Sequence, residues 1–152
     1  MTATTATDRI EKTVLIKAPR SRVWQAISDT KQFGEWFKVK LDGPFKAGQT
    51  IRGTITYPGY EGHKMEMAVE RIEPERLFSY RWHPGDPNDD YSAEPMTLVE
   101  FTLEDVPVGT RLTIVESGFD KIPLSRRAKA FRMNDEGWNE QTQFIQRYVS
   151  QS

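Results

Sequence analysis

One carboxylate lies in an otherwise apolar strand pattern and is the residue best placed for chemistry. Leu112, Ile114 and Glu116 follow one another at a spacing of two, so a β-strand would present all three on one face. That face is apolar, and a buried carboxylate is costly unless it is paired or protonated. Glu116 could therefore contact a ligand or act as a general acid or base. The alternative is that the alternation breaks near Gly118 and Glu116 meets water at the mouth of a cavity.

Two further polar residues interrupt the apolar face of a long C-terminal helix. Asp135 could pair with a ligand amine or hydroxyl, or with an inward Arg or His; a helix kink at Gly137 would instead turn it outward. Thr142 could donate a hydrogen bond inside, or bond a backbone carbonyl one turn back. Alternating steps of four and three define this face as Leu124, Ala128, Phe131, Asp135, Trp138, Thr142, Ile145 and Val149.

Large apolar side chains recur on the strand faces that should point inward and on the helices that should cover them. They could form the walls of an apolar pocket, or they could pack as an ordinary core. Together with the three polar residues, they complete the predicted ligand-binding set: Trp36, Tyr57, Met67, Tyr80, Trp82, Phe101, Glu116, Asp135, Trp138 and Thr142.

Several kinds of site lack their sequence signals. The two histidines, His63 and His83, have no partners at metal-ligand spacing, and the chain has no cysteine. A Gly-x-Ser-x-Gly elbow and a glycine-rich phosphate loop are both absent. Acidic residues crowd positions 86–90, but not at EF-hand spacing, so a solvated hairpin loop is expected there, with a lid over the cavity as an alternative. We expect no catalytic set, no metal site and no cofactor.

Composition narrows the class of protein. The chain has 152 residues, a net charge of −1 and a pI of about 6.2, which suits one domain and argues against a general nucleic-acid binder. No apolar run approaches membrane-spanning length, so no membrane partner is expected. Residues 1–7 are rich in Thr and Ala and lack the features of a signal peptide. They predict a disordered tail on a cytoplasmic protein, followed by a single domain over residues 8–150.

The order of elements predicts an α+β fold. A strand at 8–17 precedes two short helices, at 21–28 and after the capping pair Asp29 and Thr30. Alternating or β-prone segments then follow at 50–57, 63–72, 77–83, 96–104 and 110–119, separated by turn residues. Consecutive strands with tight turns form an antiparallel meander, and the amphipathic helix at 123–149 is the natural cover for its apolar face. A curved sheet of about six to seven strands would wrap on this helix.

Several short motifs occur in an order typical of a known family. They are Ala18-Pro19 with Val23-Trp24, Trp36 at the end of the second short helix, Gly43-Pro44-Phe45…Gly48, Tyr80-x-Trp82, Gly109-Thr110-Arg111-Leu112, Ser117-Gly118-Phe119, and Glu136-Gly137-Trp138 before Tyr148. Over residues 8 to 150 they resemble the homologues of the activator of heat-shock protein 90 ATPase. This family lies within the START-like, helix-grip (SRPBCC, Bet v 1-like) superfamily.

The resemblance implies a helix-grip fold and three alternative functions. The leading one is binding of a small apolar or amphipathic ligand between sheet and helix. Two departures, Thr142 where the family usually has Leu and Glu116 on an apolar face, would make that cavity more polar and argue against a purely lipidic ligand. The second is regulation of a chaperone ATPase, through the acidic loop and a basic helix face of Arg126, Arg127, Lys129 and Arg132. The third is a cyclase- or hydrolase-like enzyme with Glu116 as general base. A homodimer through exposed apolar residues at the sheet edge also stays open.

Overall fold

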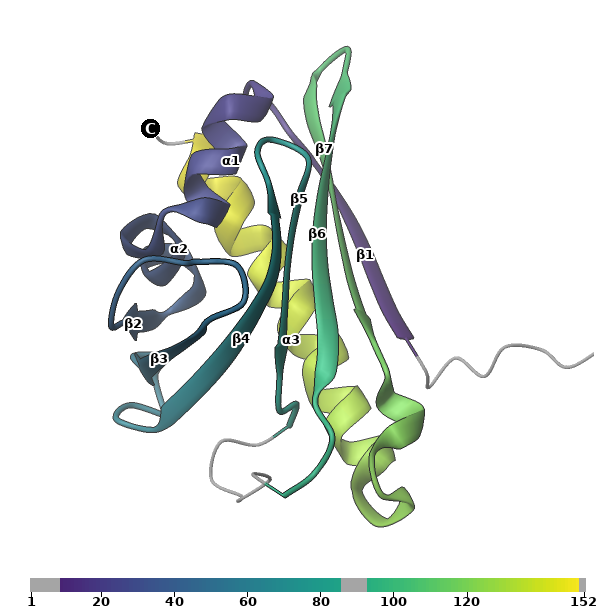
Figure 1. Ribbon diagram of the computed structural model, residues 1–152. Helices are drawn as coiled ribbons and strands as arrows, with labels where there is room; N and C mark the ends of the chain where they lie inside the picture. Colours follow the sequence, from purple (N-terminus) through teal and green to yellow (C-terminus); the bar gives the residue numbers. More distant parts are fainter. Residues whose placement is uncertain (1–8, 86–92, 151–152) are drawn as a thin grey trace, which may run out of the picture.

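The fold is a seven-stranded antiparallel sheet curved around one long helix, as a computed structural model shows (Figure 1). The structure describes residues 9–85 and 93–150, so the predicted tail at 1–7 and the acidic loop at 86–90 lie outside the described residues. The strands are β1 Arg9–Ile16, β2 Val39–Leu41, β3 Thr50–Ile55, β4 Lys64–Glu73, β5 Leu77–Trp82, β6 Thr97–Val106 and β7 Gly109–Ser117. The helices are α1 Arg20–Ser28, α2 Thr30–Phe37, the short 3₁₀ helix η1 Phe119–Lys121, and α3 Leu124–Ser150. The predicted α+β helix-grip class is confirmed.

Strand pairing follows the chain, with one crossover. The order across the sheet is β1-β7-β6-β5-β4-β3-β2. Strands β2 to β7 therefore form a meander, and its last strand, β7, pairs with the first strand of the chain, β1. The expected tight turns produce this meander, since consecutive antiparallel strands need only short connections. Strand β2 was not predicted, because three residues are too few for an alternating pattern to show.

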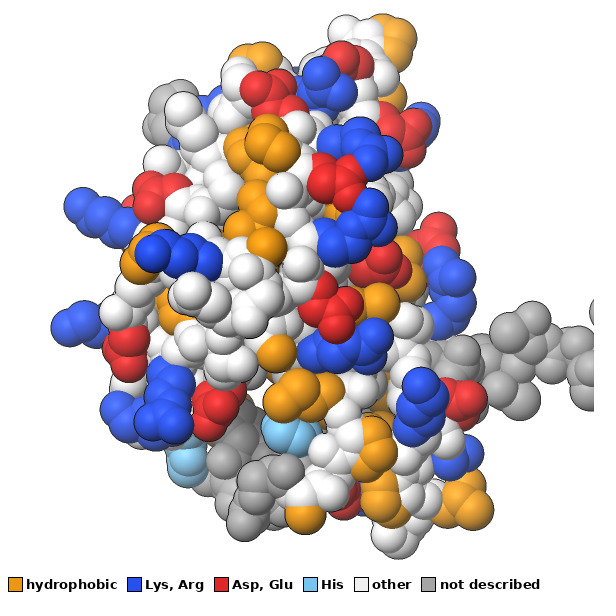
Figure 2. All heavy atoms as spheres, in the orientation of Figure 1, with side chains coloured by type: hydrophobic (Ala, Val, Ile, Leu, Met, Phe, Trp, Pro, Cys, Tyr) orange, Lys and Arg blue, Asp and Glu red, His pale blue; other side chains and the backbone are white. Residues whose placement is uncertain are grey.

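The concave face of the sheet carries the site. Strand register places Ile10, Glu116, Val99, Tyr80 and Val69 in one row across β1, β7, β6, β5 and β4. Each of these side chains is at most 3% exposed. Because side chains alternate between the two faces of a strand, the neighbours of these residues point to the convex face. In Figure 2 basic and acidic side chains are interspersed over that face. Arg81 and Glu70, for example, form an ion pair of 2.6 Å.

Helix α3 departs from the predicted line of inward residues in its first half, whereas Trp138, Ile145 and Val149 of that line are buried as predicted. Leu124 is 80% exposed and Ala128 is also exposed, whereas Ala130 and Asn134 lie on the side of Trp138. Steps of four and three correspond to 3.5 residues per turn, which drifts by about 20° per heptad from a straight helix. Counted back from Trp138, this drift carries the predicted stripe off the contact line over the first turns of the helix. The buried positions 130, 138, 145 and 149 follow a longer mean step.

The hairpin between β6 and β7 leaves no room for a side chain at Gly109. Its φ is +143°, and a Cβ there would lie 2.3 Å from the carbonyl oxygen of Ile16 and 2.8 Å from the amide nitrogen of Ala18. We expect Gly109→Ala to lower the free energy of unfolding by about 2–3 kcal/mol, since backbone strain and a clash with main-chain atoms add. Urea denaturation followed by circular dichroism measures the change.

Gly137 supplies the matched control for that substitution. It lies inside α3, which is one continuous helix, and a Cβ at this position meets nothing within 4 Å. Gly137→Ala should therefore raise the free energy of unfolding by up to about 1 kcal/mol, because alanine is the better helix former. Equal effects of the two substitutions would contradict the assignment of Gly109 to a close backbone contact.

Candidate functional site

Four neutral donors surround the Glu116 carboxylate. The indole nitrogens of Trp82 and Trp138 each donate a hydrogen bond of 2.8 Å, to Oε2 and Oε1 respectively. The Thr97 hydroxyl donates to Oε2 at 2.5 Å. The Asn134 amide nitrogen lies 2.8 and 3.0 Å from the two oxygens. Glu116 itself is 0% exposed, so the inward orientation predicted from the strand alternation is confirmed.

Local structure explains why these donors converge. Thr97 lies directly opposite Trp82 in the β5–β6 register, and it is two residues before Val99, the cross-strand partner of Glu116. The strand residues of the group therefore share the concave face. Asn134 and Trp138 are four residues apart on α3, so they project from adjacent turns of the helix toward the same point. The carboxylate thus links three strands to the helix that covers them.

The electrostatics of the site are those of a carboxylate buried without a cation. Burial raises the pKa of Glu116 above its ordinary value of 4.5, and the hydrogen bonds from Thr97, Trp82, Trp138 and Asn134 offset part of that rise. Among the described residues, Lys and Arg pair with other carboxylates and none forms an ion pair with Glu116. A carboxylate offers about four acceptor positions, so the protein's own donors occupy its capacity.

Because the pKa of Glu116 is raised in the folded state, the stability of the protein depends on pH. The folded state holds its proton more tightly than the unfolded state, so the contribution is fully present below pH 4.5 and is lost as pH rises through the raised folded pKa. We expect the free energy of unfolding of the native protein, minus that of Glu116→Gln, to fall with rising pH across this window by at most about 1.4 kcal/mol per pH unit. Urea unfolding of both proteins at a series of pH values tests this. A difference that grows with pH would contradict it.

Aromatic rings pack against one another beside the carboxylate. The ring centroids of Trp82 and Trp138 are 5.8 Å apart, and Phe37 lies 5.8 Å from the first and 6.0 Å from the second. Phe101 lies 5.8 Å from Trp138, and Tyr80 lies 5.3 Å from Trp82. The structure therefore brings four of the predicted aromatic wall residues together around Glu116.

Tyr80 adds a second buried polar group. Its side chain is 0% exposed, and its hydroxyl has no hydrogen-bond partner among the described residues. Burial, and after it the negative charge of Glu116, raises the pKa of Tyr80 well above its ordinary value, so the hydroxyl stays protonated at neutral pH.

The other predicted site residues form no hydrogen bond with Glu116 in the part of the chain that the structure describes. Trp36 and Met67 are buried in the core, where the indole nitrogen of Trp36 donates to the Ala26 carbonyl at 2.8 Å. The partly exposed Tyr57 hydroxyl donates to Glu140. Trp36 therefore lies beside the aromatic group, Met67 in the core and Tyr57 near the surface.

Asp135 and Thr142 have partners within the protein. Asp135 forms an ion pair of 2.8 Å with Lys12 on β1, and its side chain is partly exposed. Thr142 donates a hydrogen bond of 2.9 Å to the backbone carbonyl of Asn139, the alternative foreseen for it. The continuous helix shows that the inward position belongs to Asn134, one residue before Asp135, without a break at Gly137.

Asn134 and Thr97 were not predicted as site residues from the sequence. Thr97 continues the alternation of Val99, Phe101 and Leu103 by one step toward the start of β6, which was a usable signal. Asn134 lies four residues before Trp138, but the alternating steps of four and three that define the predicted helix face place Asp135 there instead.

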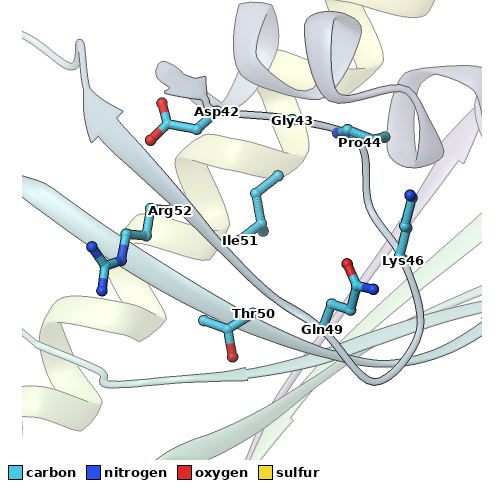
Figure 3. A pocket seen from close by; sticks show the side chains of 8 residues that line it. All are labelled: Asp42, Gly43, Pro44, Lys46, Gln49, Thr50, Ile51 and Arg52. Carbon is cyan, nitrogen blue, oxygen red and sulfur yellow. The ribbon is translucent and has the colours of Figure 1, made fainter.

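Two surface hollows lie away from Glu116. One, of about 320 Å³, is bounded by the segment 42–52, and in Figure 3 the side chains of Asp42, Thr50 and Arg52 project in different directions instead of converging. The other, of about 390 Å³, lies where Leu15 and Val108 approach the C-terminal end of α3. Neither combines convergent polar groups with an enclosed apolar wall, so the Glu116 group is the stronger candidate site.

Comparisons with known proteins agree with the fold. No curated protein matches the sequence. Among solved structures, protein MLL2253 from Mesorhizobium loti is similar, with 24% identity over 95% of this chain and 98% of that one and a TM-score of 0.75. A protein from Arthrobacter aurescens has 16% identity, covers 99% and 91%, and gives a TM-score of 0.77. The Aha1 dimer from Colwellia psychrerythraea has 17% identity, covers 93% and 95%, and gives a TM-score of 0.70.

The described helices include none that is long and apolar enough to cross a membrane. The family model described as Activator of Hsp90 ATPase homolog 1-like protein matches residues 17–150, which confirms the resemblance predicted from the motifs: the chain belongs to this family, within the START-like helix-grip superfamily.

Proposed function

We propose that this protein binds a small, partly apolar ligand between the concave face of the sheet and α3, beside the aromatic rings around Glu116. The observation that carries the proposal is the fully buried carboxylate with its four donors. Replacing a buried charged group together with its partners by well-packed apolar side chains is often neutral or stabilising, although removing one member alone is costly. Stability therefore gives little reason to keep the whole network. A polar group in an apolar, aromatic interior is typical of a ligand site.

Each part of the site has a distinct role in this proposal. Trp82, Trp138, Phe101 and Tyr80 supply the walls. Glu116 holds the two indole edges, which fixes the orientation of both rings. Trp82 and Asn134 are partly exposed, so a ligand would reach the interior past these two side chains.

The remaining predicted residues have smaller parts. Trp36 and Met67 would back the walls, whereas Tyr57, Asp135 and Thr142 are bonded nearer the surface and would lie outside the ligand's main contacts. Catalysis is not proposed, because the protein's own donors occupy the Glu116 oxygens. We propose that the protein binds its ligand in the cytoplasm.

Native and denaturing mass spectrometry of freshly purified protein tests the proposal. We expect a discrete extra mass in the native spectrum that disappears on denaturation. The occupancy should fall in Glu116→Gln and persist in Glu100→Gln, which changes an outward-facing residue of β6. An extra mass carried equally by both variants would place the ligand elsewhere. Native spectra without any adduct, in protein prepared from several growth conditions, would count against the proposal.

Family membership favours a second candidate function, regulation of a chaperone ATPase. The basic helix face predicted for docking is only partly available. Arg126 and Arg127 are engaged with Glu94 and with the carbonyl of Asp120, at 2.6 Å each, whereas Lys129 and Arg132 are exposed. ATP turnover by a heat-shock protein 90-type chaperone should rise with added protein, and less so with the Lys129→Glu, Arg132→Glu double variant. Unchanged turnover at saturating protein would dismiss this function.

Together with this second function, we propose that the protein forms a homodimer. The Colwellia psychrerythraea neighbour is described as a dimer, and this chain exposes Leu15 and Val108 by 48% and 53%. Light scattering on a size-exclusion column should then give twice the mass of one chain. The Leu15→Lys variant should give a lower mass, closer to that of one chain.

A further inference from the structure

Two buried polar atoms in the layer between sheet and α3 have no hydrogen-bond partner among the described residues. They are the Tyr80 hydroxyl and the side-chain oxygen of Gln141. The Gln141 amide nitrogen donates to the Phe37 carbonyl at 3.1 Å, so one end of this side chain is fixed while its acceptor is free. Buried polar groups normally find partners, and each exception calls for an explanation.

Tyr80 lies in the same wall as the Glu116 group. The two residues share one row of the concave face, separated by Val99 on β6. The Tyr80 ring packs against Trp82, and Phe37, whose carbonyl holds Gln141, packs against both Trp82 and Trp138. The Tyr80 hydroxyl therefore belongs to the aromatic group that the proposed ligand would contact, and Gln141 is fixed to the backbone of one member of that group.

We propose that Tyr80 is the specificity-determining residue of this site and that its hydroxyl selects a ligand with a neutral hydroxyl group, an alcohol or a phenol. This inference rests on the proposed ligand-binding function. A tyrosine hydroxyl both donates and accepts, whereas the Gln141 oxygen only accepts. A ligand hydroxyl also donates and accepts, so it can pair with the Tyr80 hydroxyl in either direction.

The charge of the neighbourhood argues for a neutral ligand group. Glu116 lies in the same row and repels an anion at Tyr80, which disfavours a ligand carboxylate or phosphate. An ammonium group would be drawn to Glu116, but four protein donors already occupy that carboxylate. A hydroxyl group needs no counter-charge and can pair with the unpartnered Tyr80 hydroxyl.

A purely structural role would predict the opposite response to removal of the hydroxyl. Phenylalanine has nearly the shape of tyrosine, so Tyr80→Phe removes one unpartnered polar atom from an apolar environment. In the ligand-free protein we expect its melting temperature to rise by about 2–4 °C. A side chain that lowers the stability of the ligand-free protein but raises its affinity for a ligand is typical of a functional site.

A matched pair of probes tests the selection. 4-Ethylphenol and 1-ethyl-4-fluorobenzene share one apolar body and differ in the hydroxyl. Their binding can be followed by the indole N–H signals of Trp82 and Trp138 in ¹H–¹⁵N spectra. We expect the native protein to bind the phenol about tenfold more tightly, and Tyr80→Phe to bind both equally. Tyr60→Phe, a change near the surface, should keep the native preference.

The outcomes separate this inference from the proposed function. Equal binding of both probes by the native protein would overturn the role of Tyr80 and leave ligand binding standing. Absence of binding by both probes would overturn selection of this class, while the mass spectrum still decides whether a ligand is carried. A lower melting temperature for Tyr80→Phe, with the phenol preference kept, would show that the hydroxyl serves the core through an ordered water.

Discussion

Replacing Glu116 by leucine should lower the free energy of unfolding by about 2–4 kcal/mol, although it puts an apolar side chain into an apolar layer. The substitution strands the donors of Trp138 and Thr97, which are buried and cannot turn to water. Trp82 and Asn134 are partly exposed and can recover some hydration. The substitution also removes the free-energy cost of burying a charge, and this offsets part of the lost stability. Urea denaturation followed by far-ultraviolet circular dichroism at pH 7 measures the change.

The control and the intermediate variant make this result specific. Glu100→Leu removes a carboxylate from the outward face of the next strand and should change stability by less than about 0.5 kcal/mol. Glu116→Gln keeps one acceptor oxygen but turns an amide toward donors, so it should fall between the native protein and Glu116→Leu at neutral pH. A Glu116→Leu protein as stable as the native one would show that the network contributes no net stability.

The sequence predicts those features that depend on local periodicity. The inward orientation of Glu116 follows from its spacing with Leu112 and Ile114, because a strand alternates strictly and needs no tertiary information. The Asp29 cap of α2 is equally local, and its side chain accepts from the Lys31 amide at 3.3 Å. Turns and alternation together fix the meander, and the motifs identify the family.

Features that depend on register and side-chain packing could not be predicted in this way. Asn134 takes the inward position because the phase of α3 is set by its contact with the sheet, which a repeating step along the sequence does not contain. The unpartnered Tyr80 hydroxyl is a property of its surroundings, since the same spacing fits a fully bonded tyrosine. The ion pair of Asp135 needs Lys12, more than 120 positions earlier, to lie opposite it.

Trp138 should be the most sensitive position of the covering helix. It is 2% exposed, contacts the rings of Phe37, Trp82 and Phe101, and donates to Glu116. Trp138→Ala should lower the free energy of unfolding by about 3–5 kcal/mol, since it opens a large cavity and removes a donor. Urea denaturation tests this against Ala130→Gly, which changes a buried residue of the same helix without opening a comparable cavity and should cost about 1 kcal/mol.

Trp138→Phe separates the hydrogen bond from the packing. It keeps an aromatic ring but removes the donor that lowers the pKa of Glu116, so that pKa should rise further above its ordinary value. Trp36→Phe removes a buried indole donor whose acceptor is a backbone carbonyl, and it should leave the pKa of Glu116 unchanged. The carboxyl ¹³C signal of Glu116, followed through a pH titration, reports the value directly. If both variants shifted the titration equally, packing of the aromatic core would control the carboxylate; a shift confined to Trp138→Phe would assign that control to the single N–H group that links α3 to the sheet.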